Sequence, residues 1–564
     1  MRTMNWIILS AALVLSGCGQ SEPGPDAGAI SGARSGSGEG NGLLAVVDAD
    51  TAYAFANLER LPEQVANKMW EINDAVAQSG NTTLADLLEE DEDVPAPIKA
   101  LIREISALQT RAGWTGAGFH ENPYYALYAV DLLPVLQLEL ADADAFSAFI
   151  ARIEGELGTP LPERVVNDVA VRWLELEPGI GVAIAWDEDS VTVALVPDDE
   201  AMLARVTGHY QPPKAFTPRM LEDFNRQNGF GAHGSGFVDW RRIVATLVGD
   251  TAPPAWLEQA GLTETLRSDA ACVAEFQALA DHMPRLIAGY TRIDVHHADM
   301  LVRQELAPEL AAGLKAVAAA PVNIDRELDG LINFGVAFDL LAARSFLASL
   351  VDQWVASPPK CKAFAEIAEQ APAWQQALAR PIPPVVSNLQ GLFVELRQLD
   401  ASGPLPAGGG VLAMYMRNPE VLVGMAEMFA PALAELQLKP GDAPKKVPND
   451  LLPQLEQTGL EAWMAMGANA IGIAVGEENV QRLEQAIDSG DGNDLLYAQR
   501  MDMSVLTRFI EMAKTAVADD EEALAALEAQ GATYEALAKL YREVAFKLRL
   551  SDQGIDLIVD SELR

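Results

Sequence analysis

The feature that most constrains the fold of this chain is a short segment that occurs twice. Residues 299–306 read DMLVRQEL and residues 556–563 read DLIVDSEL, so Asp, Val, Glu and Leu recur at matching positions. In both places a helical pattern and a strand beginning near a tyrosine, Tyr290 or Tyr541, precede the segment. Because the order of the surrounding elements recurs as well, the sequence predicts an internal duplication.

The hydrophobic pattern of each half alternates between strands and helices. In the first half, alternating apolar residues predict a meander over residues 169–196, and Asp142 is a natural helix N-cap. In the second half, residues 392–399 and 411–416 predict a hairpin across a Gly/Pro-rich loop, and Asp339 begins a helix. We therefore expect an α+β fold, a tandem duplication of mostly antiparallel sheets with helices packed on one face.

The N-terminus has the pattern of a bacterial secretory signal. Arg2 precedes a short apolar run that ends at Leu15, too short to cross a bilayer, which takes about 20 apolar residues. The sequence LSGC at residues 15–18 resembles the lipobox of bacterial lipoproteins. The resemblance implies a diacylglycerol on the sulfur of Cys18, cleavage before it and acylation of the new amino group. An ordinary signal peptide with an incidental cysteine is the alternative.

Two further resemblances bear on location. Gly19 stands where an Asp favours inner-membrane retention in enteric lipoproteins, so the resemblance implies the outer membrane, facing the periplasm. The stretch DADTAYAFANLERLP from Asp48 is similar to the start of uncharacterised proteobacterial lipoproteins, a resemblance that implies no activity. The predicted parts are a signal peptide at 1–17, the lipidated Cys18 and a flexible Gly/Ser/Pro tether at 18–42, and two α+β copies at 43–320 and 321–564.

The charge of the chain limits its partners. It has 81 acidic and 40 basic residues, a formal net charge of −41. Such a surface repels nucleic acid and anionic lipid headgroups, so we expect no nucleic-acid partner and membrane attachment through the lipid on Cys18 alone. We interpret the acidity as solubility or adaptation to a salty medium rather than as an acidic docking face. The acidic runs at 89–93 and 519–522 are expected to be solvated.

Cysteine usage predicts a cross-link between the two copies. With Cys18 committed to lipid, Cys272 and Cys361 remain in an oxidising compartment, and we expect them to form a disulfide. Since Cys272 lies late in the first copy and Cys361 early in the second, the bond would join the copies into one body. Two unpaired buried cysteines are the alternative. Neither cysteine has a His or Cys at metal-ligand spacing.

The histidines are the first place to look for chemistry. His233 and Ser235 lie in GAHGSG, but a nucleophile elbow needs a glycine where His233 stands, so we expect a Gly-rich turn. In DVHHAD, Asp294 and His296 could share a strand face and hold a metal. The matching segment of the second half has the residues of a turn, so we predict a turn with exposed imidazoles at His296 and His297.

Two glycine-rich segments also lack the residues of known phosphate-binding and calcium-binding loops. Residues 403–410, GPLPAGGG, lack the Gly-Lys-Ser/Thr of a phosphate loop, and residues 488–494, DSGDGND, lack the ligand spacing of a calcium loop. We therefore predict no catalytic, metal or cofactor-binding residues.

Three functions remain open. The leading hypothesis is a non-catalytic envelope lipoprotein that binds or scaffolds a protein, peptide or glycan. The second is a carrier of a hydrophobic ligand or lipid between envelope membranes, for which the apolar strands at 124–140 and 411–416 could line a cavity. The third is a hydrolase with dispersed catalytic residues. A large lined cavity would favour the carrier, a cleft joining His233, Ser235 and a carboxylate would favour the enzyme, and an exposed aromatic patch would favour binding.

Overall fold

The structure is a computed structural model of the chain. It describes residues 41–78, 96–208, 210–250, 252–259, 261, 263–318, 322–400, 407–448, 451–452, 455, 459–488, 490, 492, 494–518 and 520–564. The predicted signal peptide, Cys18 and nearly all of the tether lie outside the described residues, as do the acidic run at 89–93 and parts of the segments at 403–410, 488–494 and 519–522.

The strands of both halves are mostly short. Those of the first half are β1 (Tyr53–Ala56), β2 (Tyr125–Val130), β3 (Leu133–Glu139), β4 (Glu163–Val166), β5 (Val169–Glu177), β6 (Ile180–Trp186), β7 (Ser190–Pro197), β8 (Ser235–Asp239), β9 (Arg285–Ile293) and β10 (Ala298–Glu305). Those of the second half are β11 (Ile332–Ala337), β12 (Leu389–Asp400), β13 (Ala407–Met416), β14 (Lys445–Lys446), β15 (Ala462–Met466), β16 (Ala470–Val475), β17 (Leu495–Asp502), β18 (Tyr541–Ser551) and β19 (Gly554–Leu563).

The helices lie between these strands. In the first half they are η1 (Gly42–Val46), α2 (Glu63–Gln78), α4 (Ala96–Ala107), α5 (Arg111–Gly116), α6 (Ala143–Leu157), α7 (Glu200–Arg205), α8 (Pro218–Asn228), α9 (Trp240–Val248), α10 (Ala255–Gln259), α11 (Glu264–Arg267), α12 (Ala270–His282) and α13 (Pro308–Ala318). In the second half they are α14 (Leu340–Ala356), η2 (Lys362–Phe364), α15 (Ala365–Ala379), α16 (Pro384–Asn388), α17 (Pro419–Phe429), η3 (Pro431–Leu436), η5 (Glu477–Asn479), α19 (Val480–Ile487), α20 (Ser504–Ala516) and α21 (Glu521–Leu540).

Local sequence signals explain several of these boundaries. The carboxylate of Asp142 accepts a hydrogen bond from the amide of Ala145 at 2.9 Å and caps α6. Asp339 accepts from the amides of Leu341 and Ala342 and caps α14 in the same way. The predicted meander forms as β5, β6 and β7, and the predicted hairpin as β12 and β13. The expectation of a mostly antiparallel α+β fold is confirmed.

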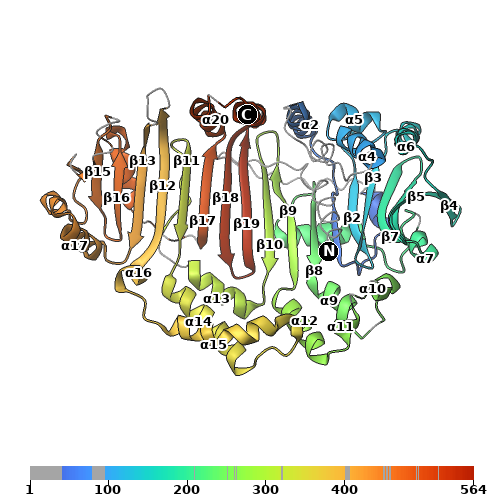
Figure 1. Cartoon of the computed structure of the whole chain (residues 1–564), viewed down its shortest axis with the longest axis horizontal. Helices are drawn as coiled ribbons and strands as arrows, with labels where there is room; N and C mark the ends of the chain where they lie inside the picture. Colours follow the sequence, from blue (N-terminus) through green and yellow to red (C-terminus); the bar gives the residue numbers. More distant parts are fainter. Residues whose placement is uncertain are drawn as a thin grey trace.

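All nineteen strands of the described residues belong to one open sheet, in which every strand pairing is antiparallel (Figure 1). Their spatial order is β4-β5-β6-β7-β3-β2-β1-β8-β9-β10-β19-β18-β17-β11-β12-β13-β16-β15-β14. Reading outward from the β10–β19 pair, the two halves place equivalent strands in the same order. This arrangement is what a tandem duplication predicts.

The repeated segment lies where the two halves join. Leu301 of β10 pairs directly with Ile558 of β19, and these residues occupy the same position in the two copies of the repeat. A residue that pairs with its own counterpart marks a pseudo-two-fold axis between the strands. The halves therefore continue one another as a single sheet and do not form two sheets held only by side-chain contacts.

The two faces of this sheet are covered differently. On the face that carries Leu301, α7 and α8 cover the first half, and α19 with Val322 and Ile324 covers the second half. We call this the covered face. On the opposite face, α6 covers the outer strands of the first half and α17 covers the outer strands of the second. Helices therefore pack on both faces of the sheet and not on one alone. The apolar sides of α6 and α17 pack on the face opposite the covered face, near the two ends of the sheet.

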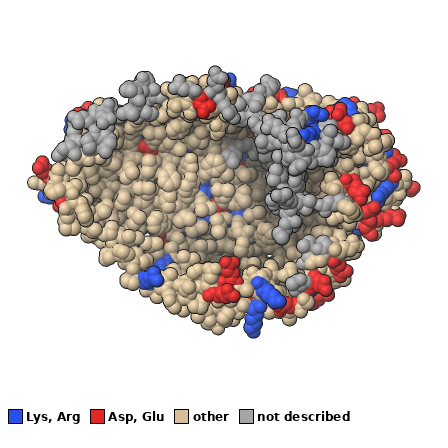
Figure 2. Space-filling view, in the orientation of Figure 1, with Lys and Arg blue, Asp and Glu red and all other residues tan. Residues whose placement is uncertain are grey.

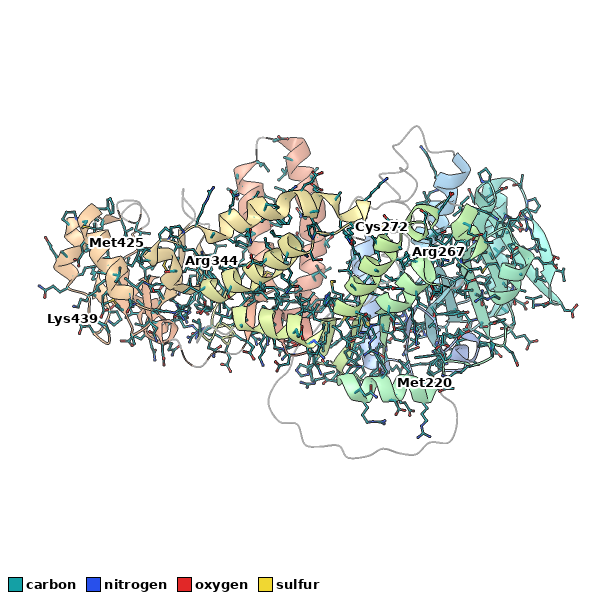
Figure 3. All side chains as sticks on the ribbon, turned by 90° about the horizontal axis from the view of Figure 1, so that it is seen from below. Met220, Arg267, Cys272, Arg344, Met425 and Lys439 are labelled. Carbon is teal, nitrogen blue, oxygen red and sulfur yellow. A yellow bond between two sulfur atoms is a disulfide. The ribbon has the colours of Figure 1, made fainter. Side chains whose placement is uncertain are left out.

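Two cross-links join the halves at the centre. The guanidinium of Arg303 donates to both carboxylate oxygens of Asp556, from Nε at 2.5 Å and Nη2 at 3.0 Å, and the side chain of Asp556 is 0% exposed. Arg549 also donates to Asp556, at 2.7 Å. The predicted disulfide between Cys272 and Cys361 is present, with a Cα–Cα distance of 4.5 Å, and it joins α12 to the segment before α15 (Figure 3).

Arg303→Ala should lower the free energy of unfolding by about 3 kcal/mol, because it removes one partner of a buried ion pair. The matched control is Arg241→Ala, which removes an ion pair whose side chains are 57% and 70% exposed. That change should cost less than about 1 kcal/mol. Urea unfolding of both variants measures the difference, and equal losses would contradict a stabilising role for the central pair.

Candidate functional site

The middle strands present buried side chains to one face and half-exposed apolar side chains to the other. On the covered face, Phe393 and Tyr415 are 0% exposed. On the opposite face, Leu412 of β13 is 38% exposed and Leu557 of β19 is 40% exposed. Since successive residues of a strand point to opposite faces, the same contrast appears on β11, β12 and β13, whereas on β19 the open face also holds the buried Val559. One face is therefore packed and the other open.

The open face is hollowed and mostly apolar. Figure 2 shows a depression over the middle strands that is mostly tan, with a few blue and red atoms near its centre and red acidic side chains gathered at one outer edge of the molecule. Helices α20 and α21 lie along one rim, and α13, α14 and α15 lie along the other (Figure 1). We call the side chains that β10, β19, β18, β17, β11, β12 and β13 present to this hollow the concave floor: Met300, Val302, Leu557, Phe546, Leu548, Tyr497, Gln499, Phe334, Val336, Leu392, Val394, Leu396, Leu412 and Met414.

The concave floor offers almost no hydrogen-bonding groups. None of its side chains carries a charge, and its two polar members bond to each other, since the Tyr497 hydroxyl donates to Oε1 of Gln499. The backbone groups below them are used in strand pairing. Seven strands at the usual spacing give the floor a length of about 29 Å. That is longer than the roughly 15 Å of hydrocarbon in one bilayer leaflet.

One end of the floor continues into a smaller hollow. It has a volume of about 270 Å³ and lies between the floor residues Leu412 and Met414 and the side chains of Leu422 and Val423 on α17. Leu433 of η3 also lines it, and every residue around it is apolar or glycine. The hollow therefore extends the apolar character of the floor beneath α17.

Charged side chains gather on the covered face, beside the pseudo-two-fold axis. Nζ of Lys547 lies 2.9 Å from Asp325 and 2.7 Å from Asp560, and Arg500 Nη2 lies 3.0 Å from Asp325. Burial alone would raise the pKa of Asp325, but Lys547 and Arg500 outweigh it and hold that pKa below its ordinary value. These pairs neutralise one another, so the group has the chemistry of a structural network.

Asp299 is the exception in this group. Burial, followed by the nearby charge of Asp560, raises the pKa of Asp299 to about 7. Its Oδ1 is buried and has no hydrogen-bond partner among the described residues. The folded chain therefore favours the protonated form of this carboxyl group.

Asp299→Asn should stabilise the protein more at pH 8 than at pH 5. Between about pH 4 and pH 7, the carboxyl group of Asp299 is protonated in the folded state and ionised in the unfolded state. The free energy of unfolding therefore falls as the pH rises through this range. Asp294→Asn is the control of opposite sign, because the amide of His296 and the ring of His297 outweigh burial and lower the pKa of Asp294. Thermal unfolding at both pH values measures the effect, and an Asp299→Asn benefit independent of pH would contradict the assignment.

The residues considered for catalysis from the sequence do not form a triad. Oγ of the buried Ser235 donates to Oδ1 of Asn225 at 2.5 Å, and the structure gives it no bond to His233. The turn at 294–297 forms as expected and exposes His296. The expectation of an exposed His297 is wrong, because this side chain is buried beside the β19 edge, with Nδ1 3.0 Å from Asp294 Oδ1.

In the described part of the chain, no group of three or more His, Cys, Asp and Glu side chains is arranged to hold a metal ion. None of the helices found there combines the length and hydropathy that a membrane span requires. Cys18 lies outside the described residues, so its lipidation stays a prediction.

Comparison with known proteins adds little. No protein-family model matches the chain, and no curated protein matches it. A solved structure described as "Structure of crystal form I of TP0453" is 10% identical in sequence, covers 50% of this chain and 88% of its own, and gives a TM-score of 0.22. A likeness at that level carries no argument about fold or function.

Proposed function

We propose that this chain is a non-catalytic lipoprotein of the bacterial cell envelope whose concave floor binds the acyl chains of a lipid. In this proposal the lipid on Cys18 anchors the chain in the outer membrane, and the folded body works in the periplasm as a carrier or holder of hydrophobic ligands. The supporting observation is the concave floor itself, an uncharged surface about 29 Å long whose two polar side chains, Tyr497 and Gln499, bond to each other.

The chemistry of the floor favours hydrocarbon over the other ligands considered. A bound peptide would bring N–H and C=O groups, and a glycan would bring hydroxyl groups, all of which lose water on binding and need new partners. The floor offers few, since its only polar side chains are Tyr497 and Gln499, which are bonded to each other. An acyl chain has no such groups, and its transfer from water onto this surface is favourable at roughly 25 cal/mol per Å² of apolar area.

The exposure of the floor supports the proposal that a ligand covers it. Soluble proteins rarely leave large contiguous apolar surfaces open to water, and such surfaces usually mark binding sites. Leu412 and Leu557 are each more than a third exposed, and the floor residues between them are half-buried. The floor is an open trough with raised rims, which suits long flexible chains better than a compact ligand.

Leu557→Asp should reduce the amount of non-covalently bound lipid per chain at least fivefold, because a carboxylate in the floor would lose its hydration when an acyl chain covers it. Leu279→Asp on α12 is the matched control, since Leu279 is 44% exposed and Leu557 is 40% exposed. Native mass spectrometry of the lipidated full chains measures the occupancy. Equal lipid content in both variants, or none in the wild-type chain, would overturn the proposed ligand.

Cys18→Ser should release the body from the membrane fraction of cells, because the thioether-linked lipid can no longer form. Fractionation followed by immunodetection measures the change, with Cys272→Ser as a control that removes a different cysteine, breaks the disulfide to Cys361 and leaves the anchor. A Cys18→Ser chain that stays with the membranes would refute anchorage through this residue.

A further inference from the structure

Helix α17 carries the most exposed large apolar side chains in the described part of the protein. Phe429 is 85% exposed and Met428 is 71% exposed. Val421 and Met425 on the same helix are 47% and 37% exposed. The opposite side of α17 packs on the end of the sheet through Val423. The helix therefore has one apolar side in the protein and a second apolar side in water, a costly arrangement unless something covers it.

The charge around α17 differs from that of the rest of the chain. Residues 417–446 contain four basic and four acidic side chains, so this segment is neutral within a chain of net charge −41. Three lysines, Lys439, Lys445 and Lys446, lie within its last eight residues, and two of them are ion-paired, Lys445 with Asp442 at 2.9 Å and Lys446 with Glu461. Met425 and Lys439 lie at the same end of the body (Figure 3). This end therefore carries less negative charge than the chain on average, and an anionic lipid surface repels it less.

We propose that the α17 end of the body docks on a lipid bilayer, with Met428 and Phe429 in the acyl region and the lysines at the level of the phosphates. Apolar side chains that project beside basic ones are the usual chemistry of interfacial membrane contacts. The proposal rests on the proposed lipid anchor, which keeps the body close to the membrane. A tethered contact can be weak, because the tether gives it a high effective concentration.

The hollow beneath α17 connects the proposed membrane contact with the concave floor. Its walls are Leu422 and Val423 of the helix on one side and the floor residues Leu412 and Met414 on the other. A bilayer against the outer side of α17 would therefore lie next to an apolar hollow that continues into the concave floor. A second protein on the same surface would leave the neutral charge and the adjoining hollow unexplained.

The test uses the lipidated full chain in vesicles of phosphatidylcholine with a minor fraction of phosphatidylglycerol. With Cys18 lipidated and Cys272 bonded to Cys361, the chain has no free thiol, so Met428→Cys can be labelled selectively with an environment-sensitive fluorophore. We expect nitroxide-bearing lipids to quench this label at least twofold. Val165→Cys is the control, because Val165 is 66% exposed on β4 at the opposite end of the sheet, and its label should be quenched by less than a tenth.

The outcomes separate this proposal from the anchor and from self-association. Met428→Cys with Phe429→Gln should lose most of the quenching while its thermal unfolding is unchanged. A chain that stays on the vesicles but shows equal quenching at both labelled positions overturns the docking proposal alone. A label that responds to protein density and not to nitroxide lipids assigns α17 to a contact between copies, which also overturns it. A chain that leaves the vesicles refutes the anchor instead.

Discussion

The antiparallel pairing of β10 with β19 is the interaction on which the rest of the architecture depends. It joins the last strand of each half, so two half-sheets become one sheet without an edge at its centre. Arg303 and Asp556 bridge this pairing with a buried ion pair, and the disulfide between Cys272 and Cys361 adds a covalent link at the rim. Because the sheet is continuous, the concave floor can take Met300 and Val302 from the first half and its other residues from the second.

The two faces of this sheet have different energetic roles. Helices and short segments cover one face and bury residues such as Phe393 and Tyr415 completely, which supplies the stability of both halves. The same strands leave the middle of the other face half-exposed, although its side chains are equally apolar. Apolar surface in water opposes solubility, and the strong negative charge elsewhere on the chain offsets this effect by repulsion between molecules. The negative charge of the chain thus compensates for the effect of the open floor on solubility.

Much of the local structure could be predicted from the sequence. Asp142 and Asp339 cap helices where expected, the meander over residues 169–196 forms, and the two internal cysteines pair. The helix caps and the meander depend on short-range patterns that one sequence carries, and the disulfide follows from the number of cysteines left after Cys18. The repeat of residues 299–306 at 556–563 also indicated a duplication, but not that the two copies of this segment would pair with each other.

The concave floor could not be predicted, and the reason is physical. Strands such as INFGVA in β11 and VLAMYM in β13 are apolar at nearly every position, which is the pattern of strands buried on both faces. Only the tertiary arrangement decides that helices cover one of these faces and leave the other open. His297 is a similar case, because its burial depends on the distant β19 and not on the turn that contains it.

The central claim is that acyl chains lie on the concave floor. The most direct measurement is photo-crosslinking in cells that have incorporated a diazirine-bearing fatty acid into their lipids, followed by purification of the protein and mapping of the modified peptides. The account predicts crosslinks on the floor residues of β10, β19, β11 and β12, such as Val302, Leu557, Phe334 and Val394. Crosslinks confined to the covered face or spread evenly over the exposed surface would contradict it.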